Sequence, residues 1–509
     1  MPRASHPPPR NALLLNCARL DATPSPPPVG LRSPERLAFA AVGISLALHV
    51  LLASAVSLSP QEAYYWQYAR HLDLSYFDHP PLAAWTIRAT TSLFGDGERA
   101  VRLAAALHAA LFALFFFLAG RRLFGGRAAL LALLAALVTP IFAMGQSIIT
   151  PDAPLLSGWV AALYFTVRAL DEERGPWLLA AGAAVGWAVL GKYTGWLLAP
   201  QILLVLLLDA RGRRLLRGPW PYLAVLVAVA LFSPVVVWNA RHHWASFRFQ
   251  LNDRGAAMAA FSADRLARFL GLQALAITPL LFLVLVAALV AAARRWREPA
   301  FRICAIFSLP ALAIFTAVSP FMWVKGNWPA PAWPAALLAA GALALERWRG
   351  RGVRALGAAA LGVAAACTAY LHLVMFVPWL PFPAQDDVVT GWKELAARVQ
   401  VERARIAGPS FVLGCGYKPA SELAYYLPDR PETYAQNAMH EVGLQYDYWR
   451  GGRELVGREG LLVLDRREWR NCLRRDELCR PLEQLVPLEV RRGGALVTTF
   501  DFWRCRFRG

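Results

Sequence analysis

Charged residues are scarce in this sequence of 509 residues. Asp, Glu, Lys and Arg make up 17% of the chain, whereas an ordinary soluble domain holds about 25%. Hydrophobic residues make up 57%. This composition excludes intrinsic disorder for most of the chain, and it fits neither a collagen-like protein nor a small disulfide scaffold. It is typical of a polytopic membrane protein.

Acidic residues are fewer than basic ones, 34 against 53, so the net charge is +19. A nucleic-acid-binding protein can be this basic but is far less apolar, and we predict no nucleic-acid partner. The N-terminal region lacks the apolar run of a signal peptide, since the leucine patch at 13–15 is too short. Residues 1–36 are rich in Pro and Arg and are predicted to form a disordered cytoplasmic tail.

Long hydrophobic runs dominate the middle of the chain. A helix of roughly 20 apolar residues crosses the hydrocarbon core of a bilayer, and on this criterion we predict about 11 spans in a transmembrane core at 37–378. No inverted repeat of the transporter kind is evident. The predicted spans lie near 37–57, 99–119, 128–145, 152–169, 177–191, 194–209, 220–238, 268–292, 302–318, 329–345 and 354–378.

The connections rich in Arg fall on the same side as the N-terminal tail, which predicts that this side is cytoplasmic. The opposite, periplasmic face of a bacterial inner membrane then carries the loops that are rich in Trp, Tyr, His, Asp and Pro. These loops are 58–98, 145–151, 239–267 and 319–328, followed by the C-terminal segment 379–509.

The C-terminal segment has the composition of a soluble domain. It contains strand-like runs and helix-like stretches, and we predict a small periplasmic α/β domain at 379–509. The strand-like runs are 411–414, 461–464 and 495–502, and the helix-like stretches are 388–403 and 419–427.

Four of the seven cysteines lie in this segment, namely Cys415, Cys472, Cys479 and Cys505. An oxidising compartment permits disulfides there. Because Cys472 and Cys479 are close in sequence, we predict that these two form a disulfide.

The first predicted outer loop begins with a helix signal. Ser59 at the N-cap, Pro60 at the first helical position and Glu62 at the third helical position form a capping box. A carboxylate in this role can also face a catalytic site, so Glu62 has both a structural and a catalytic interpretation.

Trp66 and Arg70 follow Glu62 at intervals of four residues, so one helix face presents a carboxylate, an indole and a guanidinium group. With Tyr65, this face suits a sugar and a phosphate. The alternative is that the aromatic residues form an ordinary interfacial belt.

Asp78 and His79 precede two prolines, which stiffen the backbone and fix both side chains in a turn. Asp78 is a candidate base or metal ligand, and His79 a candidate ligand or hydrogen-bond donor. Asp152 lies between Pro151 and Pro154 at the start of a predicted span and is a candidate second carboxylate of the site. For both motifs, helix capping is the structural alternative.

Cations on the same predicted face are candidates for binding a phosphate, namely Lys192, Arg241 and Arg248. Snorkelling to the membrane surface explains any one of them alone. A divalent metal is an optional cofactor, for which Asp78, His79 and His243 are the candidate ligands. The C-terminal segment shows no nucleophile elbow, no Gly-rich phosphate loop and no set of Cys and His at metal spacing.

Several blocks of this sequence, taken in order, resemble the GT-C type integral-membrane glycosyltransferases related to the protein O-mannosyltransferases. Among these, the sequence is most similar to the lipid A galacturonosyltransferase-like and aminoarabinose transferase-like subgroup. The resemblance covers about residues 37–509. The blocks are Glu62-Ala-Tyr-Tyr-Trp, Tyr76-Phe-Asp-His-Pro-Pro-Leu, Thr150-Pro-Asp-Ala-Pro, Gly191-Lys-Tyr-Thr, Trp238-Asn-Ala-Arg-His-His-Trp and Gly326-Asn-Trp-Pro.

The resemblance implies a GT-C-like fold and the transfer of a sugar from a polyprenyl-phosphate donor to a lipid or cell-envelope acceptor outside the cytoplasm. It also implies an acidic base on the first outer loop and places Asn327 among the substrate-binding residues. One position departs from the family pattern, because Gln61 stands where the family usually has Asp, and a carboxamide cannot act as a base. The base is then Glu62 or Asp78, or the activity has changed.

These residues suggest a mechanism in which a carboxylate deprotonates the acceptor and cations stabilise the departing phosphate. Direct displacement would invert the anomeric centre. Two other functions stay open at this point. One is a transporter or flippase of a lipid-linked substrate, and the other is an inactive homologue that supports envelope assembly.

Overall fold

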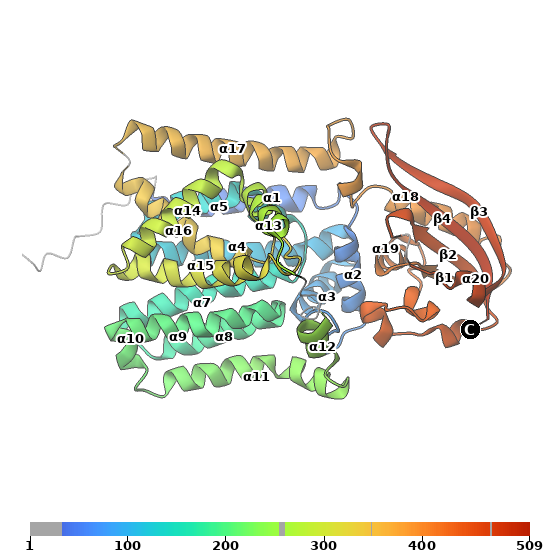
Figure 1. Ribbon diagram of the computed structural model, residues 1–509, viewed down its shortest axis with the longest axis horizontal. Coiled ribbons are helices and arrows are strands. Elements are labelled where there is room, and N and C mark those ends of the chain that lie inside the picture. Colours follow the sequence, from blue (N-terminus) through green and yellow to red (C-terminus); the bar gives the residue numbers. More distant parts are fainter. Residues whose placement is uncertain (1–32, 254–259, 348, 469–470, 509) are drawn as a thin grey trace, which may run out of the picture.

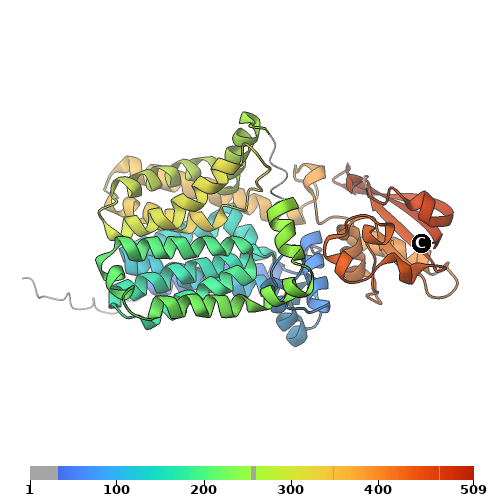
Figure 2. The ribbon, with the colours of Figure 1, turned by 60° about the horizontal axis from the view of Figure 1, so that its bottom comes forward.

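The computed structural model describes residues 33–253, 260–347, 349–468 and 471–508. Almost all of the predicted N-terminal tail, 1–36, lies outside the described residues. Figures 1 and 2 show long helices side by side in one bundle, with a sheet at one end of it, and the short helices α2, α3 and α12 at that same end. We call this the sheet-side end of the bundle.

The helical part runs from Pro34 to Phe376. Its α-helices are α1 (Pro34–Leu52), α2 (Pro60–Arg70), α3 (Leu82–Phe94), α4 (Glu98–Phe124), α5 (Gly126–Val138), α6 (Pro140–Ser147), α7 (Asp152–Glu172), α8 (Pro176–Gly191), α9 (Leu198–Leu208), α10 (Ala210–Leu215), α11 (Trp220–Arg241), α12 (Ala245–Arg248), α13 (Ala263–Ile277), α14 (Pro279–Arg294), α15 (Pro299–Val318), α16 (Trp333–Glu346) and α17 (Arg351–Phe376).

Within the described residues, six helices are long and apolar enough to cross a membrane, and the number rises to eight if each of two bent pairs counts as one span. The six are α1, α4, α7, α11, α15 and α17. Three shorter apolar helical stretches coincide with the remaining predicted spans, namely 176–191, 193–208 and 330–346. The structure therefore shows a multi-pass helical protein.

Two predicted spans are not single straight helices. The segment predicted at 128–145 bends by 68° between α5 and α6, and the segment predicted at 268–292 bends by 103° between α13 and α14. Pro140 and Pro279 begin the second helix of each pair. A proline ring blocks continuation of the preceding helix, and Thr278 adds a left-handed backbone with φ of 85°.

The C-terminal part holds a four-stranded sheet with the order β1-β2-β4-β3. β1 and β2 are parallel and the other pairs are antiparallel, with Val412 opposite Leu461 in the first pair. We call residues 392–507 the C-terminal α/β unit. Its elements are α18 (Trp392–Arg403), β1 (Phe411–Gly414), α19 (Tyr417–Tyr426), β2 (Glu459–Asp465), α20 (Arg475–Leu478), β3 (Cys479–Arg492) and β4 (Ala495–Phe507).

Strands β1, β2 and β4 coincide with the three predicted strand-like runs, whereas β3 was not predicted. β3 is an edge strand with mostly exposed or half-buried residues, so it lacks the apolar run that marks a buried strand. It also contains Pro481 and Pro487, and the pairing with β4 shifts its register at both prolines. Proline cannot donate to the ladder and is tolerated at such irregular edge positions.

The predicted disulfide between Cys472 and Cys479 is wrong. Cys472 pairs with Cys415 and Cys479 pairs with Cys505. The fold decides the pairing, because β3 carries Cys479 beside β4, which holds Cys505, while Cys472 lies on the segment that returns past the end of β1. Closeness in sequence was therefore a poor guide.

Candidate functional site

Three predicted site residues from separate segments converge on one carboxylate. Asp152 opens α7, Lys192 follows α8, and Asn327 lies in the loop before α16. The Lys192 Nζ atom lies 2.8 Å from Asp152 Oδ1, and Asn327 Nδ2 donates a hydrogen bond of 2.8 Å to Asp152 Oδ2. The N-terminus of α7 also favours a negative charge there. We call these residues the Asp152 cluster.

The Asp152 cluster lies at the sheet-side end of the bundle. Asp171, near the other end of α7, contacts Arg211 of α10, and α10 lies away from the sheet (Figure 1). Asp152 therefore occupies the same end of the bundle as the first predicted outer loop.

Two cavities meet at the Asp152 cluster. Lys192 lines the smaller cavity, of about 200 Å³, together with His79, Gln250 and several aromatic and apolar side chains. Asp152 and Asn327 line the larger one, of about 900 Å³, which lies among α6, α7, α13 and α17 and is otherwise mostly apolar. The lysine, histidine and glutamine of the smaller cavity can contact a phosphate group, and a hydrocarbon chain fits the larger, apolar space.

Asp78 lies close to these cavities but in a tight polar environment of its own. Tyr64 donates a hydrogen bond of 3.3 Å to Asp78 Oδ1, and Tyr68 donates a hydrogen bond to the same atom. Burial, and then the charge of Asp78, raise the pKa of both phenols well above the usual value. Both phenols therefore stay protonated and remain donors that hold the carboxylate in place.

The backbone around Asp78 is held from two distant segments. Gln250 Nε2 donates a hydrogen bond of 2.9 Å to the carbonyl of Asp78. Gln445, from the C-terminal α/β unit, accepts a hydrogen bond of 2.6 Å from Phe77 N through Oε1. The Gln445 backbone amide also donates to the Tyr64 hydroxyl at 3.0 Å. This support presents the next residue, His79, to the smaller cavity.

The structure places Glu62 in a structural role. It is fully buried, and the capping box with Ser59 is present. Arg102 Nε lies 2.9 Å from one carboxylate oxygen, and Arg102 Nη2 and the Ser59 amide lie 3.0 Å and 2.9 Å from the other. Because both oxygens are engaged, Glu62 is poorly placed to receive a proton from a substrate.

Among the described residues, neither cavity is lined by the candidate Tyr65 or by Trp66 and Arg70 of the predicted helix face. The Trp66 indole is buried and donates to Asp96 at 3.0 Å, and Arg70 Nη2 lies 3.0 Å from Glu432 of the C-terminal α/β unit. Tyr65 is buried, and its ring lies 5.9 Å from that of His79. Arg70 thus attaches the first loop to the C-terminal unit, as does Trp66, whose ring lies 4.9 Å from that of Tyr425 on α19.

Arg241, Arg248 and His243 are exposed near the end of α11 and on α12, and none of them lines the two cavities in the part of the chain that the structure describes. Within the same residues, no group of three or more His, Cys, Asp or Glu side chains is arranged to hold a metal ion. The predicted ligands Asp78, His79 and His243 are therefore not brought together as a metal site.

Sequence reasoning missed Tyr64, Tyr68, Gln250 and Gln445 as parts of the site. The tyrosines stand beside Glu62 in a motif that was recognised, but aromatic residues there also suit an interfacial belt. Gln445 carried no signal, because it lies more than 360 residues from Asp78 in the sequence and only folding brings the two together.

A known protein family matches the part of the chain that contains most of these site residues. Residues 78–238 match the family described as dolichyl-phosphate-mannose-protein mannosyltransferase, a segment that includes Asp78, Asp152 and Lys192.

Lipid A galacturonosyltransferase RgtD from Rhizobium johnstonii is 26% identical over 273 residues, which is 53% of this chain and 57% of that protein. An undecaprenyl phosphate-alpha-4-amino-4-deoxy-L-arabinose arabinosyl transferase from Edwardsiella ictaluri is 32% identical over 198 residues, 36% of this chain and 34% of that protein. The chain thus matches little more than half the length of the first of these relatives and about a third of the second.

Solved structures extend the likeness to almost the whole chain. The crystal structure of ArnT from Cupriavidus metallidurans in the apo state aligns with a TM-score of 0.65 and 19% identity, covering 92% of this chain and 98% of that one. The Archaeoglobus fulgidus oligosaccharyltransferase in the apo form aligns with a TM-score of 0.52 and 14% identity, covering 85% and 69%.

The chain has the fold of the GT-C glycosyltransferases. The resemblance drawn from the sequence blocks is confirmed, including the likeness to the aminoarabinose transferase-like subgroup. In this GT-C fold, the Asp152 cluster and Asp78 lie at the end of the bundle that carries the C-terminal α/β unit.

Proposed function

We propose that this protein is a glycosyltransferase that moves a sugar from a polyprenyl-phosphate donor to a lipid or other cell-envelope acceptor. The observation that carries the proposal is the ion pair of Lys192 and Asp152, in which Lys192 lines a small cavity beside His79 and Gln250, and Asp152 lines a large apolar one. The names of the relatives support it, as does a structure of ArnT bound to undecaprenyl phosphate that aligns with a TM-score of 0.64.

The donor phosphate occupies the smaller cavity in this proposal. Lys192 is the cation of that cavity, and His79 and Gln250 add polar contacts. A phosphate next to Lys192 competes with Asp152 for the ammonium group, because both are anions. Donor binding thereby loosens the ion pair and frees the Asp152 carboxylate to accept a proton.

The reaction is then a direct displacement. The acceptor hydroxyl gives its proton to Asp152 and its oxygen forms a bond to the anomeric carbon, while the bond from that carbon to the phosphate oxygen breaks. The polyprenyl phosphate leaves as an anion stabilised by Lys192. Attack from the side opposite the phosphate inverts the anomeric centre. Asp78, held by Tyr64 and Tyr68, orients the donor or serves as the second carboxylate.

We further propose that the protein lies in a bacterial inner membrane. Counting each bent pair and each of the three short apolar stretches as one crossing gives about 11 spans, an odd number, so the N-terminus and the C-terminal α/β unit lie on opposite sides. Arg-rich connections assign the N-terminus to the cytoplasm and the site to the periplasm. Reporter fusions test this, because alkaline phosphatase fused after residue 508 is active only in the periplasm.

A transporter role is less well supported. Transporters place their ionisable residues near the bilayer midplane, at the interface of repeats. Asp152 and Lys192 instead lie at the ends of α7 and α8. This position suits chemistry at a membrane surface.

Mass spectrometry of envelope lipids from cells with and without the gene tests the proposed function and names both sugar and acceptor. We expect one lipid species to lose the mass of a single sugar residue in the deletion strain. Complementation with the wild type restores it, and complementation with Asp152→Asn does not. Asp171→Asn, at the opposite end of α7, is the matched control and restores the species. An unchanged lipid profile in the deletion strain would contradict the proposal.

A further inference from the structure

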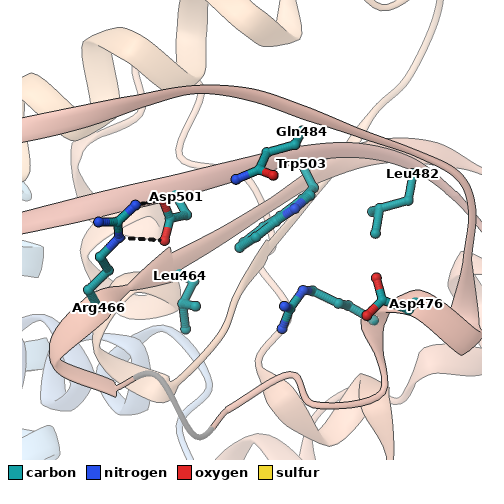
Figure 3. A pocket seen from close by; sticks show the side chains of 8 residues that line it. Leu464, Arg466, Asp476, Leu482, Gln484, Asp501 and Trp503 are labelled. Atoms are coloured by element: carbon teal, nitrogen blue, oxygen red, sulfur yellow. Dashed lines mark hydrogen bonds and ion pairs between the residues drawn. The ribbon is translucent and has the colours of Figure 1, made fainter.

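The C-terminal α/β unit has a cavity of its own, of about 610 Å³, on one face of the sheet. Figure 3 shows Gln484, Trp503 and Asp501 of β3 and β4 along this cavity, Arg466 beside Asp501, and Asp476 across from Trp503. It shares no residue with the two cavities at the Asp152 cluster. Its volume is in the ordinary range of small-molecule sites, about 300–1,000 Å³. The polar and aromatic lining residues are Arg466, Arg475, Asp476, Gln484, Asp501 and Trp503.

The charged side chains of this cavity are held in place by contacts with one another and with the rest of the unit. Arg466 donates two hydrogen bonds of 2.8 Å to the two oxygens of Asp501, as Figure 3 shows. The Arg475 guanidinium lies 4.8 Å from the ring centroid of Trp503, and it donates a hydrogen bond of 3.2 Å to the Cys472 carbonyl. Two planar cations, two carboxylates and an amide thus surround the space with balanced charge.

The wall that carries Arg475 and Asp476 is held firmly. Cys472, just before these residues, is bonded to Cys415 behind β1, and Cys479, just after them, is bonded to Cys505 of β4. Both ends of this short stretch are therefore covalently tied to the body of the unit. A site whose walls cannot move apart loses little entropy when a ligand binds.

The chemistry of the lining selects a class of ligand. Saccharides carry many hydroxyl groups, each both a donor and an acceptor, and they pair well with planar side chains such as Arg, Asp and Gln. The Trp503 ring is buried and Arg475 lies over it, so a sugar would meet this cation–indole pair, with the guanidinium available to donate to its hydroxyl groups. A phosphate or another compact anion is disfavoured by Asp476 and Asp501, and a hydrocarbon chain by the polar lining.

We propose that this cavity binds an uncharged stretch of an oligosaccharide, namely the glycan part of a lipopolysaccharide-like acceptor. The sheet that lines the cavity lies beyond one end of the helix bundle (Figure 1), so a ligand bound there lies outside the bundle. The identity of the glycan rests on the proposed function, whereas the existence of the site does not. Binding there raises the local concentration of the acceptor at the Asp152 cluster.

The test is direct binding to the full-length protein in lipid nanodiscs. The probe is the water-soluble core oligosaccharide released from lipopolysaccharide by mild acid and then dephosphorylated, and its binding is measured by saturation-transfer NMR and calorimetry. Inorganic phosphate and a disaccharide muropeptide serve as comparison ligands. We expect the core oligosaccharide to bind, and phosphate at the same concentration neither to bind nor to compete.

Two variants locate the site. Arg475→Ala removes the cation beside Trp503, and Gln484→Ala changes an exposed residue of the edge strand, which keeps the fold intact. We expect each to weaken binding of the oligosaccharide at least about tenfold. The matched control is Arg474→Ala, because Arg474 precedes Arg475 but pairs with Glu477 and does not line the cavity.

The outcomes separate the two proposals. Weaker binding in Arg475→Ala and Gln484→Ala, with wild-type binding in Arg474→Ala, supports the saccharide site. Equal binding in all three variants overturns it, as does competition by phosphate. Preferential binding of the muropeptide overturns the assignment of the ligand to a lipopolysaccharide-like acceptor. If the oligosaccharide binds as expected while deletion of the gene leaves envelope lipids unchanged, only the proposed transferase function fails.

Discussion

Lys192 and Asp152 are 40 residues apart in the sequence, yet the ammonium group of one lies 2.8 Å from the carboxylate of the other. The contact joins the end of α8 to the start of α7 and links a residue of the smaller cavity to a residue of the larger one. In the proposed function, an anionic ligand competes with Asp152 for the Lys192 ammonium group.

Removing the charge of Asp152 tests this. Asp152→Asn keeps the size of the side chain and its contact with Asn327 but cannot accept a proton. We expect kcat of sugar transfer to fall by about 10²–10⁴-fold, the usual contribution of a general base, with little change in donor binding. Lys192→Met has the complementary effect, a weaker affinity for polyprenyl phosphate measured by calorimetry. Wild-type turnover in Asp152→Asn would remove this carboxylate from the mechanism.

Gln445 is expected to act as a positioning residue for Asp78 from the C-terminal α/β unit. Gln445→Leu removes the acceptor of the Phe77 amide, so the loop that presents His79 loses one of its two supports. We expect kcat to fall by about tenfold, the value of one lost hydrogen bond, while the melting temperature changes little. Gln445→Glu retains an acceptor and is predicted to recover part of the activity. A large loss of stability with normal kcat would show a merely structural role.

Glu422 predicts a pH dependence of stability. It is buried, its carboxylate oxygens have no hydrogen-bond partner within the described residues, and it faces Glu62, Glu98 and Arg102. Burial, and then the charge of Glu62, raise its pKa well above the usual value. The folded protein therefore holds a proton that the unfolded chain releases above about pH 4.5, and stability falls as pH rises through this window.

Glu422→Gln removes that proton exchange. We expect this variant to melt at a higher temperature than the wild type at pH 7, and the difference to shrink towards pH 4. Melting curves across this range provide the measurement, and Glu394→Gln, an exposed change on α18, is the control. An identical pH dependence in wild type and Glu422→Gln would contradict the assignment.

Peptide mapping without reduction tests the disulfides. We expect linked peptides that contain Cys415 with Cys472 and Cys479 with Cys505. The first bridge closes a separation of 57 residues, so Cys472→Ser should destabilise the C-terminal α/β unit by about 4 kcal/mol on the chain-entropy estimate. A linked peptide of Cys472 with Cys479 would contradict this pairing.

Removal of divalent cations is expected to leave the stability of the protein unchanged. The described residues hold no group of three or more His, Cys, Asp or Glu side chains arranged to bind a metal ion, so we expect no bound ion to contribute to folding. Melting temperatures with and without EDTA check this. A lower melting temperature in EDTA that zinc or magnesium restores would show that a structural ion is bound.

Much of the architecture is evident from the sequence. Apolar length predicts the spans because the bilayer fixes how many residues cross it, and the capping box of Ser59 and Glu62 is local chemistry that any context preserves. Proline also acts locally, yet its effect is easily underestimated, since Pro140 and Pro279 each begin the second helix of a bent pair that the apolar length predicts as one span.

The sequence by itself determined the class of protein, the order of its helices and the presence of Asp78, Asp152 and Lys192 as candidates, because composition, periodicity and motif order are properties of the chain. Only the tertiary structure decided which candidates meet. It joined Asp152 to Lys192 and Asn327, enclosed Glu62 with Arg102, and brought Gln445 to the loop of Asp78. These contacts depend on the packing of segments tens to hundreds of residues apart, and no local pattern records that packing.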